Sequence, residues 1–269
     1  MSKFKAGFIG CGNMGFAIAE AVSKVIDAKE IVLSAKEEAE AKEKAEKISA
    51  EAGDISLVAR NSEFIFLAVK PQNLDEISES LSVILENRDD KPIIVSMLAG
   101  VEIKKLSEKL GYDAKIIRIM PNTPVSVGEG MILMSAGENV TDYDKAEFLR
   151  IMEKGGVTEE FPEKLIDAGT AISGCGPAFC FMFADALADG GVLAGIPKDK
   201  ALSLAIQTLL GSARLMAETG ISPSVLKDKV TSPGGSTIEG VKALEEGAFR
   251  ATVINAASAA YEKTKKLGK

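Results

Sequence analysis

The chain begins with a short apolar segment that leads directly into a glycine-rich loop. Residues 4–9 (FKAGFI) have the length and composition of a buried strand, and Gly10, Gly12 and Gly15 follow with the spacing Gly-x-Gly-x-x-Gly. The next residues, FAIAEAVSKVI, carry apolar side chains at helical spacing. A strand, this loop and a helix, in that order, are typical of a dinucleotide-binding site. The alternative is a structural glycine turn in another kind of α/β protein.

Each glycine has its own expected role in such a loop. Gly10 permits a tight turn, Gly12 lets the backbone approach a pyrophosphate, and Gly15 lets the helix pack close to the strand. The pyrophosphate would meet free N–H groups at the positive end of a helix dipole. We expect the cofactor to contact Gly10, Cys11, Gly12, Asn13, Met14 and Gly15, with the Cys11 side chain acting only as small filler.

The end of the next strand indicates which dinucleotide binds. The strand Ile31-Val32-Leu33 is followed by Ser34 and, two residues later, Lys36. An enzyme selective for NAD usually has Asp or Glu here, to bind the ribose 2′-hydroxyl. Ser34 and Lys36 can instead receive a 2′-phosphate, so we expect NADPH, with NADH as the alternative. The competing interpretation is that Lys36 merely begins the charged helix that follows.

Composition restricts the class of protein and its partners. The net charge of −7 and the pI near 5.0 argue against nucleic acid as a partner. We expect no membrane span, because Asp185, Asp189 and several glycines interrupt the most apolar stretch, residues 169–197. The three cysteines and the lack of a signal-peptide pattern fit a cytoplasmic enzyme. No residue of the 269 is histidine, which excludes a histidine general acid and a histidine-ligated zinc, and we expect no metal.

Strand and helix patterns alternate through the first domain, which we place at residues 1–161. The expected strands are residues 4–9, 31–33, 64–69, 92–96, 115–119 and 131–134, and helical patterns lie between most of them. Such alternation predicts a doubly wound, Rossmann-type parallel sheet. Ligands bind beyond the carboxyl ends of its strands. Those ends carry the glycine loop, Ser34, Lys70-Pro71, Ala99-Gly100 and Pro121-Asn122.

The second domain, residues 162–269, is expected to be all helical. Helical patterns cover about 174–194, 198–219, 222–229, 236–246 and 249–266. The first of them is apolar almost all round, so it has to be buried on all sides. Because a domain of this size can hardly cover such a helix alone, we expect a partner subunit to cover it.

A second glycine-containing motif lies in this helical domain. Residues 230–237 read VTSPGGST and lead into a helix that begins near Ser236. Backbone N–H groups of Ser232, Gly234, Gly235 and Ser236 at such a helix start can bind an anion, such as a substrate carboxylate. The alternative is a plain Pro-Gly-Gly turn between two helices.

Seven segments, in order along the chain, resemble the pyrroline-5-carboxylate reductase family. They are GFIGCGNMG at 7–15, FLAVKP at 66–71, the segment Ser96–Gly100, RIMPNTP at 118–124, LIDAGTAISGCGPAF at 165–179, DALADGG at 185–191 and LKDKVTSPGGSTIEGVKALE at 226–245. The resemblance implies reduction of 1-pyrroline-5-carboxylate to L-proline by NAD(P)H, the last step of proline biosynthesis. It also implies a helical dimerisation domain whose helices interleave with those of a second subunit. In many members five dimers form a decamer.

The resemblance also implies roles for individual residues. The threonine that matches Thr237 serves the ring nitrogen of the substrate, and Glu163 matches a position near the proline site. The segment Ala68, Val69, Lys70 and Pro71 resembles the cofactor loop, where we favour a positional role for Lys70 over a catalytic one. Pro121 and Asn122 are expected to line the nicotinamide pocket, near Ala99 and Gly100.

The chemistry of a cyclic imine agrees with the composition. Such an imine can bind already protonated, so the enzyme needs no strong acid, and a hydroxyl such as that of Thr237 suffices to position the ring nitrogen or relay a proton. Two other functions remain open. A β-hydroxyacid dehydrogenase would place a lysine early in the helical domain, but residues 173–191 contain none. A non-catalytic dinucleotide-binding module would need neither Thr237 nor the turn before it.

Overall fold

The computed structural model describes residues 3–267, and the chain forms two compact units. Unit 1 contains the residues up to Cys175 and the segment from Ala260 onward, whereas unit 2 contains Gly176–Ala259. Residues 162–175, which we expected in the helical domain, make their contacts within unit 1, as does the end of the last helix.

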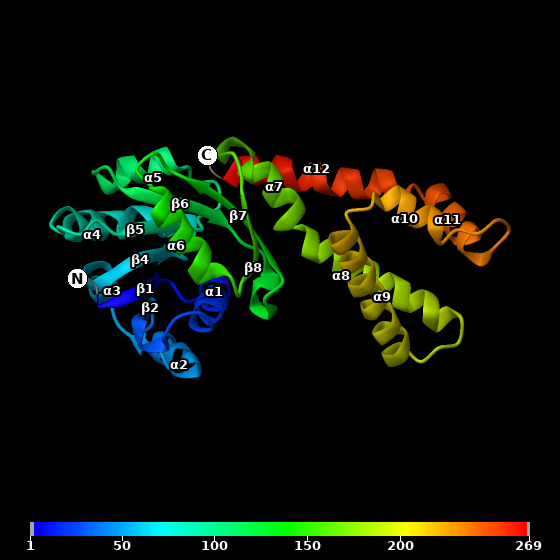
Figure 1. The fold of residues 1–269 in the computed structure, drawn as a ribbon, viewed down its shortest axis with the longest axis horizontal. Helices are drawn as coiled ribbons and strands as arrows, with labels where there is room; N and C mark the ends of the chain where they lie inside the picture. Colours follow the sequence, from blue (N-terminus) through cyan, green and yellow to red (C-terminus); the bar gives the residue numbers. More distant parts are fainter. Residues whose placement is uncertain (1–2, 268–269) are drawn as a thin grey trace. The chain divides into compact units, whose positions relative to one another are not determined.

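Unit 1 is built on an eight-stranded sheet with the order β3-β2-β1-β4-β5-β6-β7-β8. Its strands are β1 Phe4–Ile9, β2 Ile31–Ser34, β3 Glu51–Ala52, β4 Ser62–Leu67, β5 Ile93–Ser96, β6 Lys115–Met120, β7 Gly130–Ala136 and β8 Gly156–Glu160 (Figure 1). The predicted Rossmann-type sheet is confirmed, with one correction. β7 runs antiparallel to β6, because only the short 3₁₀ turn η3, Thr123–Val127, separates them, whereas a parallel return needs a long crossover.

The strands in the middle of the sheet are buried on both faces, whereas β3 and β8 at its ends are partly exposed. In β4, Phe64 and Phe66 belong to one apolar cluster, whereas Ile65 and Leu67 belong to the other. This alternation follows from the two-residue period of a strand. The Phe66 ring stacks on that of Phe8 in β1, with the ring centroids 4.5 Å apart.

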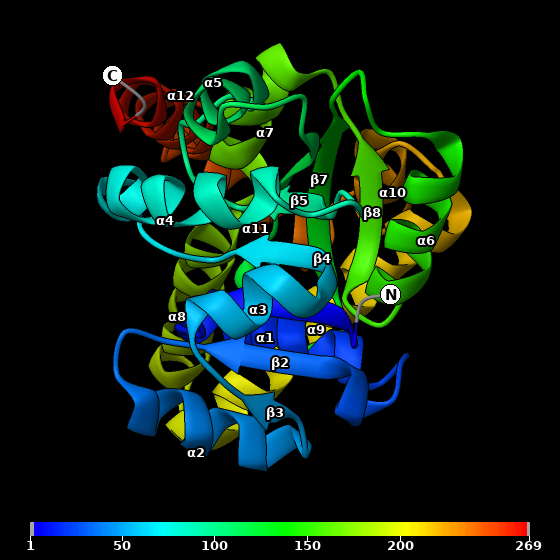
Figure 2. The same cartoon turned by 90° about the vertical axis from the view of Figure 1, so that its left-hand side faces the viewer.

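Helices cover each of these two clusters. One face is packed by α1 Asn13–Ser23, α2 Glu38–Ile48 and α6 Asp142–Met152. The other is packed by α3 Ile55–Asn61, α4 Leu74–Glu86 and α5 Ile103–Leu110, of which α3 and α4 face the viewer in Figure 2. The 3₁₀ turns η1 Ala28–Glu30, η2 Pro71–Asn73 and η4 Glu163–Leu165 join elements, and α7 Ile166–Ser173 packs against β7.

The beginning of α6 shows how a local sequence fixes a helix end. Thr141 is the N-cap, and its hydroxyl accepts a hydrogen bond from the Asp144 N–H at 3.2 Å. The Asp144 carboxylate returns a bond to the Thr141 N–H at 2.9 Å, which completes a capping box. Burial opposes ionisation of Asp144, but hydrogen bonds from Lys115 and Thr141 outweigh it and hold the pKa of this carboxyl below its usual range.

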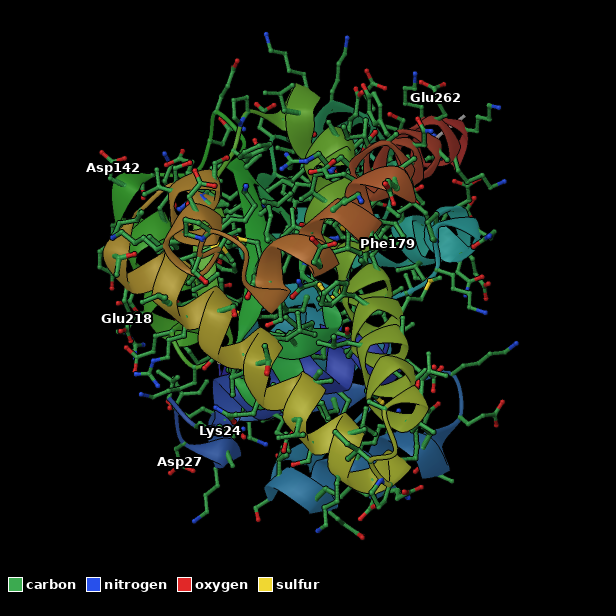
Figure 3. The ribbon with its side chains drawn as sticks, turned by 90° about the vertical axis from the view of Figure 1, so that its right-hand side faces the viewer. Lys24, Asp27, Asp142, Phe179, Glu218 and Glu262 are labelled. Atoms are coloured by element: carbon green, nitrogen blue, oxygen red, sulfur yellow. The ribbon has the colours of Figure 1, made fainter. Side chains whose placement is uncertain are left out.

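Unit 2 consists of helices, as predicted. They are α8 Gly176–Leu193, α9 Lys198–Thr219, α10 Pro223–Lys229, α11 Ser236–Glu246 and the first part of α12 Phe249–Leu267; Figure 3 labels Phe179 on α8 and Glu218 on α9. Its fully buried apolar cluster contains only small side chains among the described residues, namely Ala188, Ala201 and Ala205. Helices α8 and α9 approach closely at this cluster, since a Cβ added to Gly191 would lie 2.9 Å from the Ala201 Cβ.

Large apolar side chains of unit 2 lie on its surface. On α8, the exposed fractions are 66% for Phe181, 73% for Met182 and 91% for Leu193. By length and composition alone, the helical segment Glu163–Leu193 is also a candidate membrane span, which the interrupting charges led us not to expect. A single chain therefore does not bury α8, and this agrees with the expected need for another subunit.

Candidate functional site

The carboxyl ends of five parallel strands meet at one edge of the sheet. Ile9 at the end of β1 is in register with Ser34 of β2 and Leu67 of β4, and Leu67 is in register with Ser96 of β5. Ser96 in turn pairs with Arg118 of β6. The topology therefore brings together the loops that the sequence predicts as a cofactor site.

The glycine loop has the geometry of a phosphate-binding turn. Gly10 has φ +93°, and a Cβ there would lie 2.6 Å from the Ala68 carbonyl oxygen. A Cβ at Gly15 would collide with the Gly10 carbonyl oxygen. A Cβ at Gly12 would meet no atom within 4 Å. Gly10 and Gly15 thus serve close packing inside the protein, whereas Gly12 faces open space, which is what a ligand approaching the backbone requires.

The N-terminus of α1 is free to bind an anion. Gly12 is its N-cap, no side chain caps its first N–H groups, and its first turn carries no acidic residue. Asn13, Met14 and Gly15 supply these N–H groups. Unsatisfied N–H groups at the positive end of a helix dipole bind phosphate groups, so these residues fit the diphosphate of a dinucleotide.

The backbone behind the loop is held by α2. The Lys44 ammonium donates a hydrogen bond to the Cys11 carbonyl oxygen and another to Glu40 at 2.7 Å. The Cys11 side chain is buried, and burial raises the pKa of its thiol. The Cys11 side chain is therefore a neutral packing group at this site, and its backbone carbonyl oxygen accepts the hydrogen bond from Lys44.

Ser34 and Lys36 lie together in a cavity beside the glycine loop. The cavity has a volume of about 190 Å³ and is lined by Ile9, Gly10, Ser34, Ala35, Lys36, Ile55, Val69, Asn73, Glu76 and Ile77. A hydroxyl and an ammonium in a cavity next to a diphosphate-binding loop fit the phosphorylated ribose of NADPH. Glu76 and Asn73 belong to this cavity although no pattern in the sequence singled them out.

The loop after β4 contacts the glycine loop through its backbone. The Ala68 N–H donates to the Ile9 carbonyl oxygen at 2.9 Å, which ties this loop to the glycine loop. Lys70 is exposed and is the N-cap of η2, with Pro71 as the first residue of that turn. Ala99 and Gly100, where φ is +72°, follow β5 at the same edge.

Asn122 joins three segments of unit 1. It is buried, its Nδ2 donates to the Ser173 carbonyl oxygen at 2.9 Å, and its Oδ1 accepts from the Met131 N–H at 2.9 Å. Pro121 beside it is also buried. The amide of Asn122 therefore fixes the loop after β6 to β7 and to the end of α7.

Glu163 participates in an ion-pair network that was not apparent from the sequence. Its Oε1 accepts hydrogen bonds from the Ile103 N–H at 2.6 Å and from Arg118 at 3.4 Å. Arg118 also donates to Asp167 at 2.9 Å, and its side chain is only 2% exposed. Glu163 thus supplies a negative charge at the N-terminus of α5, where it interacts favourably with the helix dipole.

The Pro-Gly-Gly turn that the sequence predicts as an anion site precedes α11 in unit 2. The Gly235 N–H donates to the Ser232 carbonyl oxygen at 3.1 Å, and Gly234 has φ +69°. Gly235 is the N-cap, and no side chain caps the helix that begins at Ser236. The last turn of α10 carries Lys227 and Lys229 just before this segment. Lys227 pairs with Asp228 at 2.8 Å, so the turn offers a carboxylate mainly the uncapped N–H groups at the start of α11.

Thr237 lines a groove within unit 2. The groove has a volume of about 710 Å³ and is lined by Phe179, Met182, Phe183, Ala186 and Leu187 of α8, Thr237, Gly240, Val241 and Leu244 of α11, and Phe249, Thr252, Val253 and Ala256 of α12. Thr252 directs its hydroxyl to the Ala248 carbonyl oxygen at 3.1 Å. No such bond is found for the Thr237 hydroxyl among the described residues, so that hydroxyl remains available to a ligand.

Comparisons with known proteins extend over nearly the whole chain. A family model described as pyrroline-5-carboxylate reductase dimerisation matches residues 163–267, and one described as NADP oxidoreductase coenzyme F420-dependent matches residues 5–100. Pyrroline-5-carboxylate reductases of Aquifex aeolicus and Escherichia coli are similar to the chain, with 39% and 42% identity. The alignments cover 98% of this chain in both cases, and 97% and 98% of the relatives.

Solved structures agree with these matches. A pyrroline-5-carboxylate reductase from Coxiella burnetii superposes with a TM-score of 0.90, and a Plasmodium falciparum pyrroline carboxylate reductase with NADP bound superposes with a TM-score of 0.88. Both are 33% identical to this chain, and each alignment covers 100% of both chains. The chain therefore belongs to the pyrroline-5-carboxylate reductase family.

Proposed function

We propose that this protein reduces 1-pyrroline-5-carboxylate to L-proline with NADPH, the last step of proline biosynthesis. The observation that carries the proposal is the near-complete alignment with relatives of that name. The open N-terminus of α1 and the cavity at Ser34 and Lys36 provide independent support, because they fit a phosphorylated dinucleotide. The Plasmodium falciparum relative was solved with NADP bound, which agrees with this cofactor.

Unit 1 would hold the cofactor through the residues at the sheet edge. The N–H groups of Gly12, Asn13 and Met14 would bind the diphosphate, and Ser34 and Lys36 would bind the 2′-phosphate. The loops at Ala68–Pro71, Ala99-Gly100 and Pro121-Asn122 would shape the nicotinamide end. When bound, NADPH supplies the hydride that adds to the carbon of the substrate's C=N bond.

Unit 2 would hold the substrate. Backbone N–H groups of Ser232, Gly234 and Ser236 would bind its carboxylate, whereas the Gly235 N–H donates to the Ser232 carbonyl oxygen and would hold the turn in shape. The Thr237 hydroxyl would form a hydrogen bond with the ring nitrogen. A proton on that nitrogen makes the adjacent carbon more electrophilic, and it remains there as the N–H of proline after hydride addition. The substrate can bring this proton as an iminium, so Thr237 acts by positioning it or relaying it.

Glu163 is a further proposed substrate-binding residue. Its Oε1 already receives the Ile103 N–H and a guanidinium N–H of Arg118. A contact with the substrate would therefore use the other carboxylate oxygen, and the network would fix the direction in which that oxygen points. Asp167, which pairs with the same arginine, would strengthen this orientation.

We further propose that residues 162–269 act as the dimerisation domain of a cytoplasmic homodimer. The apolar side chains of α8 are exposed in a single chain, and contact with a second subunit would bury them. The family model that matches residues 163–267 is described as a dimerisation domain. The proposed arrangement has the helices of two subunits interleaved. Association of five dimers into a decamer is the larger assembly to test by sedimentation.

The direct experiment is an assay of NADPH oxidation with 1-pyrroline-5-carboxylate. We expect Thr237→Ala to lower kcat about ten- to a thousandfold, the range for loss of one positioned donor or relay. Thr237→Ser should keep part of the activity, and NADPH affinity should be unchanged, because the cofactor residues lie in unit 1. The loss should shrink at lower pH, where more of the imine arrives protonated.

Thr252→Ala is the matched control. Thr252 lines the same groove, but its hydroxyl is bonded to the Ala248 carbonyl oxygen just before α12. Its replacement should leave kcat within about twofold of wild type, because no ligand contact is lost. Unchanged turnover of Thr237→Ala above neutral pH would remove Thr237 from the mechanism. If wild type binds NADPH and oxidises a β-hydroxyacid instead, the result supports a β-hydroxyacid dehydrogenase. If it binds NADPH and turns over neither substrate, the result supports a non-catalytic dinucleotide-binding module.

A further inference from the structure

Helix α2 carries three lysines, and one of them differs from the others in its surroundings. Lys42 and Lys47 form surface pairs with Glu38 and Glu43, and their side chains are 62% and 56% exposed. The Lys44 side chain is only 16% exposed, although it also pairs with a glutamate four residues away, Glu40. The charged run of α2 is therefore a solvated face except at Lys44.

The Lys44 ammonium is surrounded by groups from three elements. It donates hydrogen bonds to the Cys11 carbonyl oxygen in the glycine loop and to Glu40 in α2, and it lies 5.9 Å from the centroid of the Phe16 ring in α1. Each of these contacts favours a cation. Together, the three contacts hold the ammonium beside the Cys11 carbonyl oxygen of the glycine loop.

The contact with Cys11 determines how the loop presents its donors. The Cys11 carbonyl and the Gly12 N–H belong to one planar trans peptide, in which the two groups point in opposite directions. Holding the carbonyl oxygen toward Lys44 therefore directs the Gly12 N–H away from Lys44. A Cβ added at Gly12 would meet no atom within 4 Å, so a ligand can approach the backbone beside this N–H.

We propose that Lys44 is a positioning residue for the diphosphate of the cofactor, acting through the Cys11–Gly12 peptide. The proposal rests on the proposed use of NADPH. Lys44 holds the loop in its binding conformation before the cofactor arrives, and its positive charge adds to the attraction for the diphosphate. Preorganisation of this kind lowers the entropic cost of binding. Lys36, by contrast, would act on the 2′-phosphate alone.

The test separates the two phosphate sites with two ligands. NADPH carries both the diphosphate and the 2′-phosphate, whereas adenosine 2′-monophosphate carries only the latter. We expect Lys44→Met to weaken NADPH about ten- to a hundredfold, since a charge-assisted hydrogen bond and a nearby charge are lost. Its affinity for adenosine 2′-monophosphate should be unchanged. Lys36→Met should weaken both ligands.

Matched variants separate positioning from charge alone. Lys47→Met removes the same charge from an exposed position of the same helix, and it should leave both affinities within about twofold of wild type. Lys44→Arg keeps a charged donor and should restore most of the NADPH affinity. In steady-state assays, Lys44→Met should raise the KM for NADPH with kcat unchanged, as expected for lost ground-state binding.

Several results would overturn the proposal. They are equal NADPH affinity in wild type and Lys44→Met, a parallel loss of adenosine 2′-monophosphate, or an equal effect of Lys47→Met. If Lys44→Met does not fold, Lys44→Gln replaces it, and an NADPH affinity equal to that of wild type refutes the idea. If wild type itself does not bind NADPH, the proposed function fails, and that failure is visible before any variant is measured.

Discussion

The Arg118 network provides a quantitative test of the packing around the sheet edge. Arg118 is 2% exposed, whereas its partners Glu163 and Asp167 are 29% and 30% exposed. Its Nε is buried and has no hydrogen-bond partner among the described residues. The arginine therefore depends on two carboxylates, and Asp167 makes the shorter contact, 2.9 Å against 3.4 Å.

Replacing Asp167 by Asn should leave Arg118 insufficiently compensated. Breaking a buried ion pair from one side costs about 3–5 kcal/mol. Because the carboxylates are partly solvated and Glu163 remains, we expect about 2–3 kcal/mol here. That loss corresponds to a decrease in Tm of about 4–12 °C for a chain of this size. Arg118→Met should cost less, since it removes the buried charge and leaves two partly solvated carboxylates.

The assay is unfolding by urea, followed by circular dichroism at one fixed protein concentration. In the double variant Arg118→Met/Asp167→Asn, the second substitution should add less than about 0.5 kcal/mol, because its partner is already absent. Asp199→Asn is the control, since Asp199 also lies in the first turn of a helix but is exposed beside Lys200. Additive losses, or a loss for Asp167→Asn no larger than that for Asp199→Asn, would refute this reasoning.

Three further predictions follow from other contacts. Lys36→Glu should weaken NADPH by about 1–3 kcal/mol and NADH much less, because it replaces an attractive charge at the 2′-phosphate with a repulsive one; fluorescence titration that shows both cofactors unaffected would contradict the role of Lys36. Phe181→Asp should give unfolded or aggregated protein, since the proposed interface would bury an unpaired charge at a cost of several kcal/mol; a soluble, active monomer in sedimentation would rule out the obligate dimer. Asp144→Asn should destabilise the protein by about 1–2 kcal/mol at pH 7, through loss of the charged acceptor in the capping box and of the Lys115 pair. The folded-state pKa of Asp144 is lowered. The stability that its carboxylate contributes is therefore complete above the pKa of Asp in the unfolded chain, about 3.9, and is lost as the pH falls through the lower folded-state pKa. In acid-unfolding curves, a stability difference between variant and wild type that persists unchanged below pH 3 would argue against this role of Asp144.

Strong periodic patterns allowed most of the fold to be predicted. The glycine loop, β1, β2, β5 and the helices of unit 2 lie where the sequence places them. The strands β3 and β8 were missed, because Glu51–Ala52 is too short to form a pattern and GVTEE at 156–160 is largely polar. The direction of β7 was also missed, since an apolar run shows that a strand is buried but not which way it runs.

The candidate site could be predicted only where local sequence determines its geometry. The spacing of Gly10, Gly12 and Gly15 predicts a phosphate-binding turn, because this spacing after a strand is typical of such turns. Lys44 gave no comparable indication. It occurs in a helix rich in Glu and Lys, and its buried contact with Cys11 depends on how α2 packs beside the loop. Long-range contacts of this kind require the tertiary structure.

The small buried cluster of unit 2 has a consequence for how this region can change in evolution. The fully buried cluster of unit 2 contains only alanines among the described residues. In the proposed homodimer, folding of these helices and association of the two copies would therefore form a single equilibrium, so dilution should lower the apparent stability. In a symmetric pair every substitution on α8 occurs twice, once in each copy, and its effect on the shared equilibrium is doubled. Selection on these apolar positions should therefore be stricter than their exposure in a single chain suggests.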